Sequence, residues 1–517
     1  MKRFLPAIVC GVCVAYAGAI MLRPVPSPKG FNIAAFGRLP VVMSGRVQPI
    51  DTVGRIGLLQ IRRTVTVPTD ETGGWNWGRS PQMLDATEWL LEVMTSPAAD
   101  TRRIFPIQDA TVLRKLNLKG ADEGLNYYTF KDLEPRLTDI QKEAARINKE
   151  KTKDRAAWEQ EWIRLRAALV IYERLKNTLQ PNSFRESDDA SRAVPYDFAA
   201  RLARYQRELK QGVETAIARE HGKEQPLDKA VEESMRAFAR PYIGVSRVGM
   251  IAMIPPADVA GGRDRWENIG TSIVDSARTG RMPAAVASFA AMSSAFAQGK
   301  ADLFNTELAK YRQSLQARGL GAEVSRARSE YFYNHFQPYL RATAIYLVAC
   351  VLMSLALVRR SAMLRRSAMS LVIVAFLLHT SGLLFEMMVE GRLPVTSIYS
   401  LIIVAGWMSV LLAAGMHRVT GHGLAMLVAP LAGLMAFIAA HSLAPGGAVE
   451  LVRETLDGTF WLTIAALAAT FYVAGRWNRG SGRAFNSQDA AERARGGFSL
   501  ARVWRGRVAV ESSIAPR

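Results

Sequence analysis

Histidines are the residues of this chain whose positions point most directly to chemistry. His379 lies inside a strongly apolar stretch. The polar turn Glu390–Pro394 begins about eleven residues later, or roughly 16 Å away at about 1.5 Å per residue. An ionisable side chain within a membrane span is costly, and it usually faces a bundle interior or a cavity. His379 is therefore a candidate site residue, and a neutral imidazole hydrogen-bonded to a neighbouring helix is the alternative.

Two further histidines are expected on the same side of a membrane as the turn after His379. His441 lies at the end of an apolar stretch, and His335 lies in Tyr333–Pro338, just before another. Neutral imidazole is a common ligand of metal ions and of haem iron, so histidines gathered there could hold either. Their spacing alone does not distinguish a ligand from a packing or interfacial histidine.

Other chemistries lack their residue patterns. The sequence contains no HExxH, CxxCH or GxSxG motif, no P-loop, and no paired carboxylates within a span. Cys10 and Cys13 have the spacing of a redox pair, but they lie in an apolar run, and Val14 stands where covalent haem attachment needs histidine. We interpret that spacing as chance. With Cys350 as the third cysteine, there is no disulfide framework.

Membrane spans are the elements that would position these histidines. The chain has 517 residues, a net charge of +20 and 49% hydrophobic residues, which indicates apolar spans joined to a charged soluble part. The basic residues are spread along helical stretches and concentrated beside the spans, so membrane topology explains them better than nucleic acid binding. The predicted spans are Met1–Leu22, Ala342–Val358, Ala368–Met388, Ile398–Met416, Gly423–His441 and Phe460–Gly475.

Positive charge alternates between the connections of these spans. Lys2 and Arg3 precede the first span, and the run Arg359–Arg366 crowds the connection after the second. By the positive-inside rule, the sequence predicts six spans with both termini in the cytoplasm. It divides the chain into a membrane anchor or signal at 1–23, with an uncleaved anchor favoured over a cleaved signal peptide, an exported region at 24–338, a five-span domain at 339–475 and a basic tail at 476–517.

The exported region is predicted to be mostly helical, so the fold class is mainly α: a polytopic helical bundle with a large helical region between spans 1 and 2. Arg38–Thr52 carries Pro and Gly punctuation, which predicts extended chain and turns before a helix from Asp51 or Thr52. Apolar residues then recur at helical spacing. The segments concerned are Thr87–Met94, Leu137–Leu179, Tyr196–Glu220, Asp228–Ala239, Ile269–Gln298 and Lys300–Arg318. For Leu137–Leu179 a long helix or a helical hairpin is predicted.

Short motifs in the second half of the chain resemble a known family. Gly391–Tyr399 (GRLPVTSIY), Ile438–Leu443 (IAAHSL) and Thr455–Leu462 (TLDGTFWL) are similar to segments of the CcsA (ResC-like) cytochrome c assembly proteins of System II. The opening Leu39–Thr52 is similar to that of larger bacterial members. The resemblance covers residues 38 to 135 loosely and 370 to 475 more closely.

The resemblance implies a bacterial inner-membrane protein with a periplasmic region that handles haem at the outer membrane face. Members of this family present haem to exported apocytochrome c, together with a ResB-like membrane partner, as part of a cytochrome c synthase. On this reading His379 is an intramembrane axial ligand or orients one, His441 is an outer-face ligand, and His335 is a third candidate. Arg392 would pair with a haem propionate, because its fork matches a carboxylate; an interfacial anchor is the alternative.

Departures from the family pattern leave the enzymatic role open. The tryptophan-rich WGxxWxWDxxE motif is missing, Glu386 stands where arginine is common, and Ser397 stands where asparagine is common. The tail at 476–517 predicts a disordered cytoplasmic segment or a chain that ends early, without the haem-presenting half. The alternative function is a non-catalytic membrane scaffold, or a truncated remnant, that binds a partner through its exported region. A transporter is a third reading, but the sequence has no internal repeat.

Overall fold

The computed structural model describes most of the chain between residues 30 and 443. The described residues are 11, 15, 30–69, 82–120, 126–149, 155–182, 197–221, 228–259, 262, 265–390, 398–420 and 423–443. The main parts of the chain form two compact units that divide between Phe336 and Gln337. We name Met21–Phe336 the N-terminal unit and Gln337–Ala444 the bundle unit. The predicted membrane domain begins at residue 339, close to this division.

The N-terminal unit is mainly helical, and its short described strands form antiparallel pairs. Its α-helices are α2 (Ile33–Gly37), α3 (Ile50–Arg62), α4 (Ala86–Thr95), α5 (Ala110–Lys115), α6 (Phe130–Leu133), α7 (Leu137–Lys149), α8 (Ala157–Lys176), α10 (Phe198–Glu220), α11 (Lys229–Ala239), α12 (Tyr242–Val248), α13 (Ile269–Thr279), α14 (Ala284–Ala297), α15 (Ala301–Ala317) and α16 (Gly321–Phe336). Its 3₁₀ helices are η2 (Pro97–Thr101) and η3 (Glu134–Arg136). Its strand pairs are β1 (Pro40–Met43) with β2 (Arg46–Pro49), β3 (Thr66–Pro68) with β4 (Met83–Asp85), and β5 (Phe105–Ile107) with β6 (Asn126–Tyr128).

The β1–β2 hairpin is followed directly by α3. Met43 pairs with Arg46, so the loop between β1 and β2 consists of Ser44 and Gly45. Both loop residues have positive φ, 53° and 76°, as a two-residue type I′ turn requires. Helix α3 then begins at Ile50, one residue before the predicted start.

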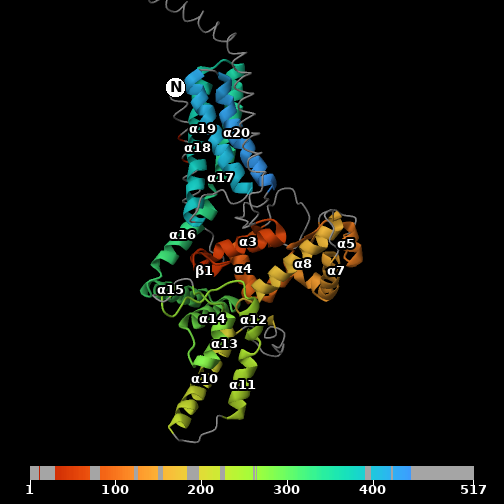
Figure 1. Ribbon diagram of the computed structural model, residues 1–517, viewed down its shortest axis with the longest axis vertical. Coiled ribbons are helices and arrows are strands. Elements are labelled where there is room, and N and C mark those ends of the chain that lie inside the picture. Colours follow the sequence, from red (N-terminus) through yellow and green to blue (C-terminus); the bar gives the residue numbers. More distant parts are fainter. Residues whose placement is uncertain are drawn as a thin grey trace, which may run out of the picture. The chain divides into compact units, whose positions relative to one another are not determined.

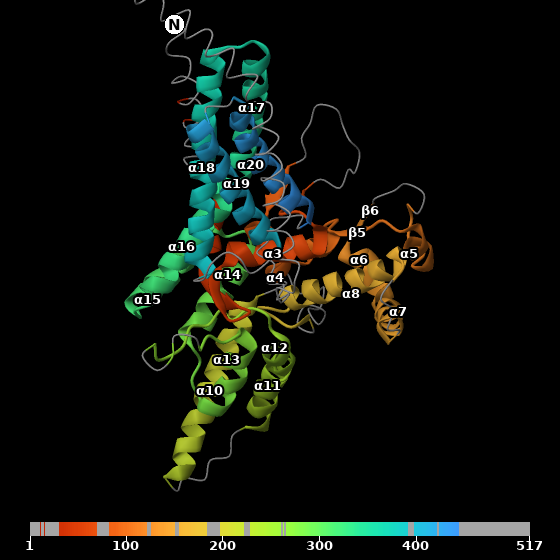
Figure 2. The same cartoon turned by 45° about the horizontal axis from the view of Figure 1, so that its top comes forward.

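The predicted helical segments appear as helices, and two of them are divided. Leu137–Leu179 forms α7 and α8, which contact each other as a hairpin. Ile269–Gln298 forms α13 and α14, because Gly280 takes a left-handed φ of 67° at the end of α13 and Pro283 precedes α14. Tyr196–Glu220 and Asp228–Ala239 correspond to α10 and α11, which run side by side in Figures 1 and 2.

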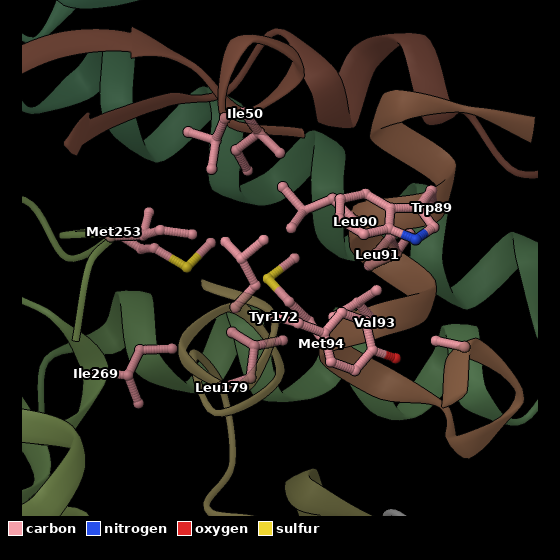
Figure 3. Packing of buried hydrophobic residues seen from close by; sticks show 14 of the residues in the cluster. Ile50, Trp89, Leu90, Leu91, Val93, Met94, Tyr172, Leu179, Met253 and Ile269 are labelled. Carbon is pink, nitrogen blue, oxygen red and sulfur yellow. The ribbon is translucent and has the colours of Figure 1, made fainter. Parts of the chain in front are cut away.

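One apolar core holds the N-terminal unit together. Figure 3 shows part of it, in which Ile50 of α3, Trp89 and Leu90 of α4 and Tyr172 of α8 belong to the same cluster. All four side chains are buried. Since α3, α4 and α8 pack on one another, they give the polar residues at the start of α3 a fixed position.

The bundle unit consists of apolar helices that lie side by side (Figures 1 and 2). They are α17 (Pro338–Val358), α18 (Ala362–Glu390), α19 (Ile398–Thr420) and α20 (Gly423–Leu443). Many of their apolar side chains face outward; Val358 is 81% exposed and Leu377 is 62% exposed. Such a surface is stable only where something other than water covers it, which is the situation of helices in a lipid bilayer.

Three described helical stretches are long and apolar enough to span a membrane, so the chain is a membrane protein. They are Gly321–Val358, Ala362–Val389 and Tyr399–Met416. These stretches contain the predicted spans Ala342–Val358 and Ala368–Met388 and nearly all of Ile398–Met416. The predicted span Gly423–His441 lies in α20, whose apolar described part, Leu427–Ala440, is shorter. The predicted spans Met1–Leu22 and Phe460–Gly475 and the tail at 476–517 lie outside the described residues, apart from Gly11 and Ala15.

Candidate functional site

His379 is completely buried inside the bundle unit. Its side chain on α18 has no solvent exposure, and Nε2 lies 3.1 Å from the carbonyl oxygen of Ile403 on α19. A carbonyl can only accept a hydrogen bond, so Nε2 carries the proton and donates it. Nδ1 then carries a lone pair, and among the described residues it has no hydrogen-bond partner.

Aromatic rings from two neighbouring helices enclose the imidazole. The ring of Phe437 on α20 lies 4.6 Å from that of His379, measured between centroids. Tyr339 and Tyr346 on α17 lie nearly perpendicular to it at 6.0 and 6.3 Å. Like Nδ1, the Tyr346 hydroxyl is buried and has no partner among the described residues. The imidazole thus combines a fixed orientation with an unused lone pair in an apolar setting.

Glu386 forms a second polar centre in the same bundle. It lies two helical turns beyond His379 on α18 and is 5% exposed. The Tyr339 hydroxyl donates to Oε2 at 2.8 Å, and the Ser400 hydroxyl of α19 donates to Oε1 at 2.7 Å. Because the Tyr339 ring also contacts His379, it links the two buried polar residues. From the sequence, Glu386 was only a departure from the family pattern. Its two hydroxyl donors were not predicted.

A buried polar network in the N-terminal unit involves the segment that resembles larger family members. Asp51 is fully buried. Its Oδ2 accepts hydrogen bonds from Arg55 Nε at 2.8 Å and from Asn334 Nδ2 at 3.0 Å. Its Oδ1 accepts one from the Thr87 hydroxyl at 3.0 Å. Helices α3, α4 and α16 are therefore joined at a single carboxylate.

Glu330 of α16 performs the same role for the β1–β2 hairpin. Its carboxylate accepts two hydrogen bonds from the Arg46 guanidinium, at 2.6 and 3.0 Å, and one from Thr52 Oγ1 at 2.8 Å. Arg46 also donates to Gln48 Oε1 at 2.6 Å. The polar side chains between Arg46 and Arg55 thus form hydrogen bonds with other residues of the N-terminal unit.

His335 lies at the edge of this network and has contacts at both ring nitrogens. Nδ1 lies 2.9 Å from the Tyr331 carbonyl and donates to it. Nε2 lies 3.4 Å from Arg55 NH2, and the imidazole stacks on the Tyr331 ring at 4.1 Å. Haem ligation by His335 would therefore require a break in the contact with Arg55.

The ligand atoms of Asp51, Asp85 and His335 lie within 4.8 Å of one another, which is close enough to hold a metal ion. Arg55 already supplies positive charge there: its guanidinium lies 2.8 Å from Asp51, 3.8 Å from Asp85 and 3.4 Å from His335. Burial lowers the pKa of Arg55, but the neighbouring Asp51 and Asp85 carboxylates outweigh burial and raise it above its ordinary value. This geometry describes an arginine-centred ion-pair network rather than a metal site.

The structure places the predicted site residues in different parts of the chain. His379 belongs to the bundle unit and His335 to the N-terminal unit. His441 lies in α20, but its side chain is outside the described residues, and Arg392 lies outside them altogether. Of the two predicted residues whose side chains are described, His379 and His335, His379 has a buried ring nitrogen without a hydrogen-bond partner among the described residues.

One imidazole nitrogen of His379 is held by a hydrogen bond, and the other offers a lone pair, as in a metal-ligating histidine. No protein-family model matches the chain, and no curated protein matches it significantly.

Proposed function

We propose that this chain takes part in cytochrome c biogenesis by handling or presenting haem at the outer face of a bacterial inner membrane. The proposal includes six spans, two cytoplasmic termini and a periplasmic N-terminal unit. It rests on the resemblance to CcsA proteins and on the apolar helices of the bundle unit. Apocytochrome c and a ResB-like membrane protein are the partners that this function requires.

The state of His379 carries the proposal. A buried polar atom without a partner is uncommon, because it loses the hydrogen bond that it would have in water. In the part of the chain that the structure describes, Nδ1 of His379 is such an atom, and it belongs to a residue type that binds haem iron. A ligand at Nδ1 would satisfy it.

Several residues of the chain would have distinct roles in binding haem. The Ile403 carbonyl fixes the tautomer and orientation of His379, so that Nδ1 keeps its lone pair. Tyr339, Tyr346 and Phe437 exclude water from the ring. Haem, when bound, supplies two reactive parts: an iron that accepts an imidazole nitrogen, and vinyl groups that react with cysteine thiols. Arg392 would pair with a propionate, and His441 would be an outer-face ligand.

Absorption spectroscopy and a pyridine-haemochrome assay on the detergent-purified chain test the proposal. We expect a Soret band in the wild type and loss of at least half of the bound haem in His379→Ala. His379→Gln is the sharper variant, because its amide can still donate to the Ile403 carbonyl but offers no ring nitrogen. His441→Ala tests the second predicted ligand. His221→Ala is the matched control, because His221 is an exposed histidine of the N-terminal unit.

The outcome also decides between haem handling and the scaffold alternative. One observation favours a scaffold. The polar residues Arg46, Asp51 and Thr52 form hydrogen bonds within the N-terminal unit, which is a structural role rather than ligand binding. A folded wild type without haem, from cells that supply haem, would support the scaffold. Equal haem content in His379→Gln and His221→Ala would remove His379 as a ligand.

A further inference from the structure

A cluster of arginines lies in the connection between α17 and α18 and at the start of α18. We name it the arginine turn: Arg359, Arg360, Arg365 and Arg366. All four are exposed, and the connection is only three residues long, from Arg359 to Ser361. Its backbone is fixed, because Ser361 N donates to the Ala356 carbonyl and Arg365 N donates to the Ser361 carbonyl, both at 3.1 Å. The four charges are therefore held within one short helical hairpin.

No described carboxylate of the bundle unit lies near these charges along the chain. Its described acidic residues are Glu386 and Glu390. Glu386 is twenty residues beyond Arg366 on the same helix, or about 30 Å at 1.5 Å per residue. In the described part of the chain, the four guanidinium groups make no ion pair or hydrogen bond. Among the described residues of the unit, the turn is thus a concentrated positive charge without a neutralising carboxylate.

The surface beside the arginine turn is apolar. Val358 directly precedes Arg359 and is 81% exposed, and Leu355 one turn earlier is 41% exposed. Helix α17 has 21 residues. At 1.5 Å per residue it is about 31 Å long, close to the thickness of a hydrocarbon core. A bilayer around α17 therefore places the turn at the level of the lipid phosphates.

We propose that the arginine turn binds the phosphate of anionic phospholipid headgroups. A free anion would use only the guanidinium groups, whereas a phospholipid also covers the exposed apolar residues next to them. Arginine suits this ligand, because its planar fork donates two parallel hydrogen bonds to phosphate oxygens. Clusters of basic residues next to a span attract anionic lipid in this way. The inference does not depend on haem handling.

Native mass spectrometry of the full chain in detergent micelles tests this proposal. The chain is titrated with phosphatidylglycerol or with phosphatidylcholine of the same acyl chains. At low salt we expect the wild type to retain phosphatidylglycerol about tenfold better than phosphatidylcholine, and the preference to weaken as salt is added. A variant with all four arginines changed to glutamine should lose the preference. The corresponding lysine variant should keep most of it, because it keeps the charge.

A matched control removes the same charge elsewhere. It changes exposed arginines of the N-terminal unit to glutamine: Arg240, Arg247, Arg312 and Arg328. This control should keep the wild-type preference. If the fourfold glutamine variant does not fold, Arg365→Gln with Arg366→Gln should still reduce the preference severalfold.

Three results would overturn the proposal. The first is equal retention of the two lipids by the wild type. The second is an unchanged preference in a folded glutamine variant. The third is full displacement of phosphatidylglycerol by inorganic phosphate at the same concentration, which would identify a free-anion site instead.

Discussion

The buried Asp51 is stable because its donors come from separate elements. Arg55 lies one turn further along α3, Thr87 belongs to α4 and Asn334 to α16. A fully buried carboxylate is acceptable only when a cation and additional donors compensate for the lost water. Asp51 is therefore as much a part of the packing of the N-terminal unit as its apolar neighbours.

Asp51→Asn should destabilise the N-terminal unit by about 3 kcal/mol. The change keeps the shape of the side chain but leaves the largely buried guanidinium of Arg55 without its closest carboxylate. Chemical denaturation of the full chain in mild detergent, followed by tryptophan fluorescence, measures the loss. Asp302→Asn is the control, because Asp302 is exposed on α15. A loss below about 0.5 kcal/mol for Asp51→Asn would contradict the role of this ion pair.

At the scale of elements, the contact between α3 and α4 depends on a missing side chain. A Cβ atom at Gly54 would lie 2.5 Å from the carbonyl oxygen of Ala86 and 2.9 Å from its carbonyl carbon. Backbone atoms cannot move aside as the end of a flexible side chain can. The two helices can approach this closely only because residue 54 is glycine.

Gly54→Ala should therefore destabilise the chain by about 1–3 kcal/mol, since the helices must separate to admit the methyl group. Gly244→Ala is the matched comparison: Gly244 lies in α12, and a Cβ there would meet nothing within 4 Å. That change should stabilise the chain by up to about 1 kcal/mol, because alanine favours helix. Thermal unfolding of the two variants distinguishes these effects. Equal shifts in the same direction would contradict the packing argument.

At the scale of the whole molecule, the sequence predicted the helices better than the contacts between them. Periodicity identified the segments that became α8 and α10, because a helix depends on residues three and four apart, and the length of an apolar run identified the span within α18. The bond between Arg46 and Glu330 joins residues 284 positions apart, so no local spacing could indicate it. Glu330 itself is buried in α16, a helix that lies outside the predicted helical segments.

For the candidate site, the sequence predicted the burial of His379 but not the residues that surround it. An apolar stretch around His379 predicted a buried imidazole, and the structure gives it the backbone partner Ile403. The aromatic rings of Tyr339, Tyr346 and Phe437 come from α17 and α20, whose packing against α18 depends on tertiary contacts. Their place around the imidazole could not be predicted from the sequence around His379.

Positive charge at one end of α17 predicts how the chain is oriented in the membrane. By the positive-inside rule we expect the arginine turn in the cytoplasm, and a chain that crosses the bilayer once along α17 would then have its N-terminal unit outside. Single cysteines in a background without Cys10, Cys13 and Cys350 report the two sides. Gln313→Cys on α15 and Ala362→Cys at the start of α18 are suitable, because both positions are exposed.

An impermeant maleimide should modify Gln313→Cys once the outer membrane is opened, with the inner membrane still intact. Ala362→Cys should react only after the inner membrane is also opened, because the bilayer separates it from the reagent. We expect at least a fivefold difference in labelling between the two positions under the first condition and equal labelling in detergent. Equal labelling before the inner membrane is opened would mean that α17 does not separate the two positions, and the six-span topology would then be wrong.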